Sequence, residues 1–156
     1  YTIERPLHLG AALAGADEAT IGAFRGYGRD VGIAFQLRDD LLGVFGDPAI
    51  TGKPAGDDLR EGKQTVLIAR AVELLAPDEV AALDADLGDP DLGADRVAHW
   101  QAVLEACGAR QAVEERVAVL SHEAAGAVAG LLAHGVPEDV SAELTRLIDA
   151  YTSRRH

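Results

Sequence analysis

Residues of the kinds that bind metal ions and phosphate lie within one short stretch of this sequence. Asp39 and Asp40 end the apolar segment 32–40 (GIAFQLRDD), and Lys53 and Lys63 lie near the two ends of the Gly-rich segment 51–63 (TGKPAGDDLREGK). These are the only two lysines in the chain. Carboxylate oxygens bind hard metal ions, and lysine ammonium groups bind phosphate oxygens. The stretch therefore predicts a site for a metal ion and a diphosphate group.

The acid pair is predicted to lie on a polar stripe of a long helix. With Asp17 as N-cap, the pattern predicts a helix that reaches about Phe45 and is roughly 40 Å long. At about 100° per residue, one narrow arc of this helix holds Gly32, Gln36, Asp39, Asp40 and Gly43.

Apolar residues occupy most of the remaining circumference of this helix, with Arg38 as the exception. Burying an unpaired carboxylate costs roughly several kcal/mol. The stripe is therefore expected to line a cavity that supplies water, metal or cations. A solvent-facing stripe on an ordinary amphipathic helix remains the alternative.

Four glycines precede or begin this stripe in the same helix: Gly22, Gly26, Gly28 and Gly32. Their spacing by four, in two pairs, predicts that a neighbouring helix or a ligand chain approaches closely. The alternative is that some of them mark a break near Tyr27.

The rest of the sequence predicts an all-α helical bundle and a single domain over residues 1–156. Alanine and leucine, which favour helices, are abundant, and aromatic residues make up only 4% of the chain. Short Gly/Pro breaks of the kind that connect helices in bundles separate the predicted elements. We expect a helix tail up to residue 15, the long helix over 17–45, a loop to about residue 62, and helices over 63–76, from 77, over 92–106, over 110–134 and over 137–151.

Charge and composition narrow the range of partners and compartments. The net charge of −12 disfavours nucleic acid or an anionic membrane as a partner, because both require a basic surface. No apolar run is expected to reach the roughly 20 residues that span a bilayer. Cys107 is the only cysteine, so no internal disulfide can form, which fits a cytoplasmic protein. The chain has no Met and starts at Tyr1 within a patterned segment, so we expect a piece of a longer protein.

The motifs resemble those of the trans-isoprenyl diphosphate synthases, the polyprenyl synthetase family. The similarity lies in Phe35-Gln36-x-x-Asp39-Asp40, in Gly46-Asp47, and in the loop Gly52-Lys53-Pro54-x-Gly56-x-Asp58-Leu59-x-x-Gly62-Lys63-x-Thr65. The acid pair resembles the second aspartate-rich motif of the family, and the segment 5–11 (RPLHLGA) is similar to the helix before it. The resemblance covers the whole chain but only the C-terminal half of a typical member.

This resemblance implies the isoprenoid synthase fold, an all-α bundle around a central cavity, usually in a homodimer. It implies a prenyltransferase that uses Mg²⁺ to join an allylic diphosphate to isopentenyl diphosphate head to tail. The product is a longer linear polyprenyl diphosphate of the farnesyl or geranylgeranyl type. Magnesium stabilises the departing pyrophosphate in such a reaction.

The resemblance also implies roles for individual residues. Asp39 and Asp40 resemble metal-binding aspartates, and Gln36 would contact the allylic diphosphate or the reacting carbons. Lys53 and Lys63 resemble the lysines that bind diphosphate. The resemblance also implies a catalytic role for Lys53, together with the acid pair and Gln36. Asp58 resembles an acidic loop residue that contacts the metal through water or another ligand. Arg154 and Arg155 resemble a basic C-terminal end that closes over the substrate.

Two features depart from the family pattern. The second motif often continues to a third aspartate, but Gly43 stands at that position, so metal binding is expected to depend on Asp39 and water. The first aspartate-rich motif is absent from this chain, as are the upstream basic residues that would hold isopentenyl diphosphate. The chain alone is therefore expected to hold half a site and to be inactive.

Two other functions remain open at this point. A terpene cyclase of the same fold would use the acid pair. The loop 52–63 argues against a cyclase, because a cyclase does not need to hold a second diphosphate substrate in this way. A non-catalytic helical subunit would use the acids only to solvate a helix face.

Overall fold

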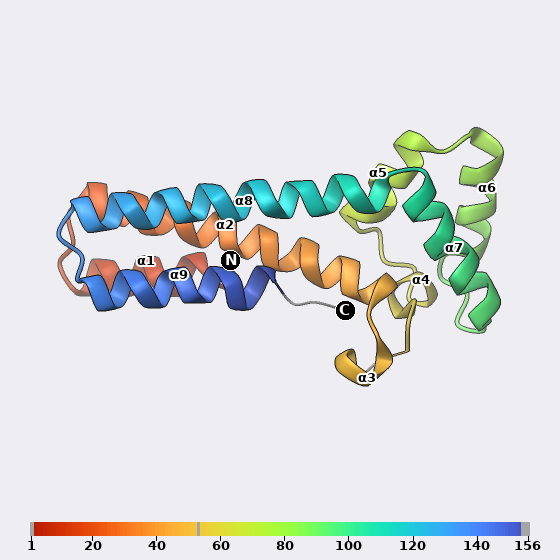
Figure 1. Cartoon of the computed structure of the whole chain (residues 1–156), viewed down its shortest axis with the longest axis horizontal. Coiled ribbons are helices and arrows are strands. Elements are labelled where there is room, and N and C mark those ends of the chain that lie inside the picture. Colours follow the sequence, from red (N-terminus) through yellow and green to blue (C-terminus); the bar gives the residue numbers. More distant parts are fainter. Residues whose placement is uncertain (1, 53, 154–156) are drawn as a thin grey trace. The chain divides into compact units, whose positions relative to one another are not determined.

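The chain is helical apart from short connections. The computed structural model describes residues 2–52 and 54–153, and it contains no strand within those ranges (Figure 1). In chain order the helices are α1 (Glu4–Leu13), α2 (Glu18–Phe45), α3 (Pro48–Thr51), α4 (Asp57–Arg60), α5 (Val66–Leu74), α6 (Pro77–Asp86), α7 (Ala94–Ala106), α8 (Ala109–Ala133) and α9 (Glu138–Thr152). The prediction of an all-α fold is confirmed.

The long helix α2 begins and ends where its local sequence predicts. The Oδ1 atom of Asp17 accepts a hydrogen bond from the backbone N–H of Thr20 at 2.8 Å, which satisfies one of the free donors of the first turn. The helix then continues for 28 residues to Phe45 without interruption. The alternative of a break near Tyr27 is therefore wrong.

The connection after α2 is more structured than the predicted loop. It contains the short helices α3 and α4, each of four residues. Asp47 caps α3, because its Oδ1 atom accepts a hydrogen bond from the N–H of Ala49 at 2.8 Å, and Pro48 occupies the first helical position. Helices this short bury too few residues to leave a periodic pattern, so the sequence did not reveal them.

The later helices agree with the predicted ranges to within a few residues at each end. Thr65 caps α5 by accepting a hydrogen bond from the N–H of Ile68 at 3.3 Å, and Pro77 opens α6. Trp100 on α7 donates from Nε1 to Oδ2 of Asp86 at 2.7 Å, and this hydrogen bond lowers the pKa of Asp86.

Contacts divide the chain into two compact units. Among the described residues, the first unit combines residues 2–36 with residues 116–153, and the second contains residues 37–52 and 54–115. The prediction of a single domain over residues 1–156 stays a prediction.

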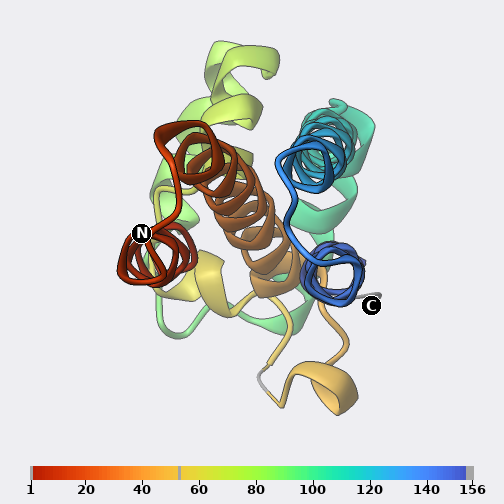
Figure 2. The same cartoon turned by 90° about the vertical axis from the view of Figure 1, so that its left-hand side faces the viewer.

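The first unit is a bundle of α1, the first part of α2, the later part of α8, and α9, which Figure 2 shows nearly end-on. All four helices contribute to one apolar cluster. Its buried members are Tyr27, Val31, Ala124, Val128, Leu131, Leu144 and Ile148. Leu7 of α1 and Ile3, the residue just before α1, pack against them. A Cβ atom on Gly28 would lie 2.6 Å from Cα of Glu4, so this glycine permits the predicted close approach of a helix. Gly22, Gly26 and Gly32 have open space instead.

Tyr27 joins this core to α9 and gives a pH-dependent prediction. Its hydroxyl donates to the carbonyl oxygen of Leu144 at 2.8 Å, and burial raises the pKa of Tyr27 from 10.0 to about 12. Tyr27→Phe should lower the free energy of unfolding at pH 7 by about 1 kcal/mol. The unfolded chain ionises first as the pH rises, so the wild-type advantage should be complete below pH 10 and disappear towards pH 12. Urea unfolding of both proteins across this pH range measures the difference in free energy of unfolding. A difference that does not change with pH would contradict the prediction.

One described helix is long and apolar enough to cross a membrane by length and composition alone. This helix is α8, with a mean hydropathy of 1.2 over its most apolar window, of which 28% is buried. The expectation that no apolar run reaches the length of a membrane span was therefore wrong, as far as length and composition decide it. A core helix of a soluble protein passes the same test, and the absence of a membrane span stays a prediction.

Candidate functional site

The acid pair lies near the C-terminal end of α2, and its two members differ in exposure. Asp39 is exposed, whereas Asp40 retains only 7% of its accessible surface. Leu41 and Val44 on the same segment are fully buried, which fixes the rotation of α2 about its axis. The helix therefore presents one carboxylate to solvent and places the other at the edge of the core. Gln36 lies one turn before them and is exposed.

The loop that carries the predicted diphosphate-binding lysines is held by backbone contacts. Arg60 donates from Nε to the carbonyl oxygen of Leu92 at 3.0 Å and from Nη1 to that of Ala55 at 2.9 Å. The N–H of Gly88 donates to the carbonyl oxygen of Leu59 at 2.8 Å, and the side chain of Leu59 is fully buried. The segment around α4 is thus fixed at both of its ends, a function of Arg60 that the sequence motif did not reveal.

Lys63, at the end of this loop, is held by two carboxylates. Its Nζ atom lies 2.5 Å from Oδ1 of Asp58 and 2.7 Å from Oε2 of Glu61. The hydrogen bond to Asp58, followed by that to Glu61, raises the pKa of Lys63, so its ammonium group stays charged at physiological pH. Its side chain is 44% exposed, and the two ion pairs seen among the described residues use two of its three N–H donors. Lys53, Arg154 and Arg155 lie outside the described residues.

Asp58 connects this loop to α2. Its side chain is buried, and a Cβ atom placed on Gly43 would lie 2.2 Å from both Cγ and Oδ2 of Asp58. The carboxyl group of Asp58 therefore occupies the space of a side chain at position 43, one turn beyond Asp39 and Asp40. The sequence identified Gly43 only as the place of a missing acid, and this contact between distant positions left no signal in it.

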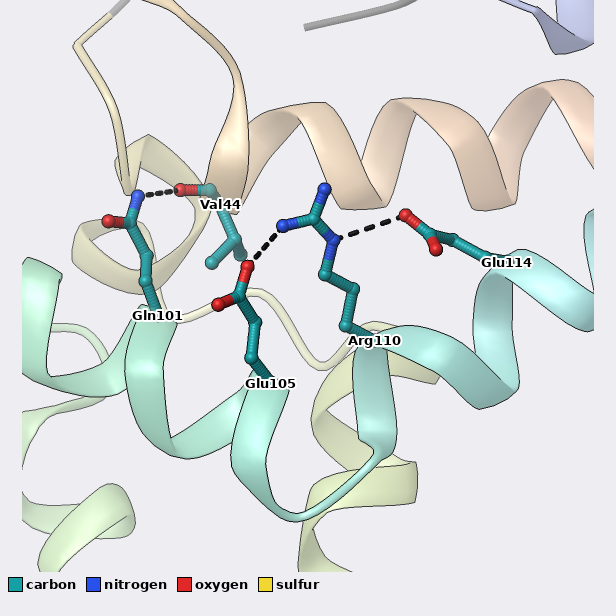
Figure 3. A network of polar contacts seen from close by, with 5 residues as sticks. All are labelled: Val44, Gln101, Glu105, Arg110 and Glu114. Atoms are coloured by element: carbon teal, nitrogen blue, oxygen red, sulfur yellow. Dashed lines mark hydrogen bonds and ion pairs between the residues drawn. The ribbon is translucent and has the colours of Figure 1, made fainter.

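A polar network supports the end of α2 (Figure 3). Gln101 on α7 donates from Nε2 to the carbonyl oxygen of Val44 at 2.7 Å, which satisfies one of the free acceptors of the last helical turn. The guanidinium of Arg110 stacks 4.5 Å from the ring centroid of Phe45 and pairs with Glu105 and Glu114. Sequence reasoning missed both residues, because each acts through a contact between distant segments.

A mostly apolar cavity of about 600 Å³ lies in the second unit. Residues of α7 and of the segments 48–52 and 54–60 line this cavity, among them Pro48, Pro54, Val97 and Gln101. None of its lining residues belongs to the acid stripe, so the expectation that the stripe lines a cavity is not met by this cavity.

The donor set of this region suits a divalent cation that keeps part of its water. Within the described ranges, no three carboxylate, histidine or cysteine side chains gather closely enough to form a complete metal cage. Mg²⁺ needs no such cage, because it is usually held by one or two carboxylates, waters and the phosphates of a substrate. Asp39, the exposed member of the pair, offers one such carboxylate.

Comparison with known proteins identifies the family. The sequence profile of the polyprenyl synthetases matches residues 1–104. This chain belongs to that family. The resemblance stated from the motifs is therefore confirmed.

Relatives of this polyprenyl synthetase chain include prenyl diphosphate synthases of defined product. It is 48% identical over 77 residues to geranylgeranyl diphosphate synthase of Mycobacterium tuberculosis, an alignment that covers 48% of this chain and 22% of that protein. It is 39% identical over 114 residues to geranylfarnesyl diphosphate synthase of Aeropyrum pernix, which covers 73% of this chain and 35% of that protein.

Solved structures give the same result for the fold. Geranylgeranyl pyrophosphate synthase of Corynebacterium glutamicum, complexed with isoprenyl diphosphate and magnesium, aligns with a TM-score of 0.90 and 46% identity, covering 99% of this chain and 43% of that one. The expected isoprenoid synthase fold is thus confirmed. This polyprenyl synthetase chain spans less than half the length of these relatives. The roles of its individual site residues stay predictions.

Proposed function

We propose that the protein containing this chain is a prenyltransferase that joins an allylic diphosphate to isopentenyl diphosphate and releases pyrophosphate. The product would be a longer linear diphosphate of the farnesyl or geranylgeranyl type. The observation that carries this proposal is the combination of an acid pair on α2 with the held cation Lys63, in a chain of the polyprenyl synthetase family. Relatives named as geranylgeranyl and geranylfarnesyl diphosphate synthases support the reaction class.

Each side chain of the site has a distinct proposed role. In this proposal, Asp39 and Asp40 hold Mg²⁺ through carboxylate oxygens, with water and diphosphate oxygens completing its coordination. Bound Mg²⁺ would neutralise the charge that develops on the departing pyrophosphate. Lys63 donates its remaining N–H to a diphosphate oxygen, and Gln36 positions the allylic substrate from one turn earlier on α2. Lys53 is proposed as the second diphosphate-binding lysine.

The reaction itself is a substitution at an allylic carbon. The carbon–oxygen bond to the diphosphate breaks and its electrons leave with pyrophosphate. The double bond of isopentenyl diphosphate then attacks the allylic cation, a carbon–carbon bond forms, and a proton is lost to restore a double bond. We further propose that the protein is cytoplasmic and works as a homodimer, as the family resemblance implies.

A product assay tests this function in the full-length protein. The protein is incubated with an allylic diphosphate, isopentenyl diphosphate and Mg²⁺, and the products are separated by mass spectrometry. A longer linear diphosphate, formed only when both substrates are present, is the expected result. A cyclic hydrocarbon formed from the allylic substrate alone would indicate a terpene cyclase, and the absence of any product would indicate a non-catalytic helical subunit.

A further inference from the structure

The space beside Gly43 is filled by a carboxylate from another helix. A Cβ atom on Gly43 would lie 2.2 Å from Cγ, 2.2 Å from Oδ2 and 2.6 Å from Oδ1 of Asp58. Contacts this short do not occur between real atoms, so no side chain fits at position 43 while Asp58 keeps this position. By contrast, Gly22 on the same helix has nothing within 4 Å of the same hypothetical atom.

The backbone that carries Asp58 is held in place, and its side chain is largely enclosed. Its side chain is only 9% exposed, and the backbone of α4 is held by the two hydrogen bonds of Arg60 and by the bond from Gly88 to Leu59. The N–H of Lys63 also donates to the carbonyl oxygen of Asp58 at 3.0 Å. Asp58 and Lys63 are thus joined through both backbone and side chain, and a displacement of the Asp58 carboxylate would leave the ammonium group paired with Glu61 alone among these two carboxylates.

We infer that the space left by Gly43 accommodates the Asp58 carboxylate. We also infer that Asp58 is a positioning residue, which holds the diphosphate-binding ammonium group of Lys63 in place. The inference rests on the proposed function for the nature of the ligand. In this arrangement Gly43 is a requirement of the site, since the acid that α2 lacks at this position is provided by α4. An acid restored at position 43 would compete with Asp58 for the same space and should impair the site.

Competitive acetylation of lysine tests the steric part of this inference. The full-length protein is treated with a limiting amount of acetic anhydride near pH 9, and the acetylation rates of Lys63 and Lys53 are compared by peptide mass spectrometry. Lys63 should react slowly, because ion pairing keeps it protonated and partly shielded. Gly43→Ala should raise the Lys63 rate about tenfold, the change that corresponds to one pKa unit. Gly22→Ala, the matched control on α2, should leave it unchanged.

Three further variants test the same contact if Gly43→Ala folds poorly. Asp58→Asn preserves side-chain volume and removes the charge, so it should raise the Lys63 rate to a similar extent and increase KM for the allylic diphosphate more than it changes kcat. The exchange Gly43→Asp with Asp58→Gly should return the Lys63 rate to within about threefold of wild type. Gly43→Asp alone should not.

The labelling result is independent of turnover. An unchanged Lys63 rate in Asp58→Asn, or equal rates in folded Gly43→Ala and Gly22→Ala, would overturn the inference even if the product assay succeeds. The opposite outcome is also possible to recognise. If Lys63 is labelled slowly in the wild type and rapidly in these variants, but the protein makes no prenyl product, the positioning contact stands and the proposed function is rejected.

Discussion

Asp39→Ala in the full-length protein should lower kcat/KM for the condensation of allylic and isopentenyl diphosphates by about 10²- to 10³-fold, the typical loss when one charge-stabilising group is removed from a transition state. The reason is that Asp39 is the exposed member of the acid pair and is proposed to hold the Mg²⁺ that neutralises the departing pyrophosphate. Because the side chain is exposed, its removal should leave the free energy of unfolding nearly unchanged. Asp40 is buried, so its replacement would combine a loss of activity with a loss of stability.

The measurement combines steady-state turnover with calorimetry of Mg²⁺ and pyrophosphate binding. Asp84→Ala is the matched control, because Asp84 is also an exposed aspartate on a helix of the second unit. Loss of coupled Mg²⁺ and pyrophosphate uptake in Asp39→Ala, with normal uptake in Asp84→Ala, is the expected pattern. Turnover at the wild-type level in Asp39→Ala would reject the assignment.

Gly56→Ala should lower the free energy of unfolding by about 3 kcal/mol, through two effects that can be separated. Gly56 has a φ of 73°, and this left-handed conformation costs an alanine roughly 1–2 kcal/mol. In addition, a Cβ atom there would lie 2.4 Å from Cγ1 of the buried Val97 on α7, and such overpacking costs about 1–3 kcal/mol. The same change should displace the start of α4 and therefore Asp58.

Gly52→Ala is the control that isolates the backbone effect. Gly52 has a φ of 71°, but nothing lies within 4 Å of a Cβ atom placed on it, so only the conformational cost of roughly 1–2 kcal/mol should appear. Urea unfolding measures both variants, and a double-mutant cycle with Val97→Ala should recover the steric part for Gly56→Ala alone. Equal destabilisation by the two glycine replacements would show that the contact with Val97 carries no cost.

Local signals in the sequence were sufficient to predict most of the helices. Asp17 before α2 and Pro77 at the start of α6 each act on backbone groups within one turn. Their effect can therefore be deduced from a few neighbouring residues. The short helices α3 and α4 were missed, because four residues bury too little surface to produce a periodic pattern.

The candidate site was predictable in its composition and less so in its connections. The acid pair and the loop lysines were identified from residue type and spacing, and the family resemblance that they indicated is confirmed, while their individual roles stay predictions. The contact between Gly43 and Asp58, and the hydrogen bond from Gln101 to Val44, depend on tertiary packing. Spacing within one helix carries no information about them, so they required the folded structure.

The network around the end of α2 is divided between two parts of the chain. Gln101, which caps the helix, lies inside the segment that matches the family profile, whereas Arg110 and its partners Glu105 and Glu114 follow residue 104. The end of α2 that carries the acid pair is thus supported both from inside and from beyond the matched segment, so residues 1–104 alone do not contain all the contacts that hold it.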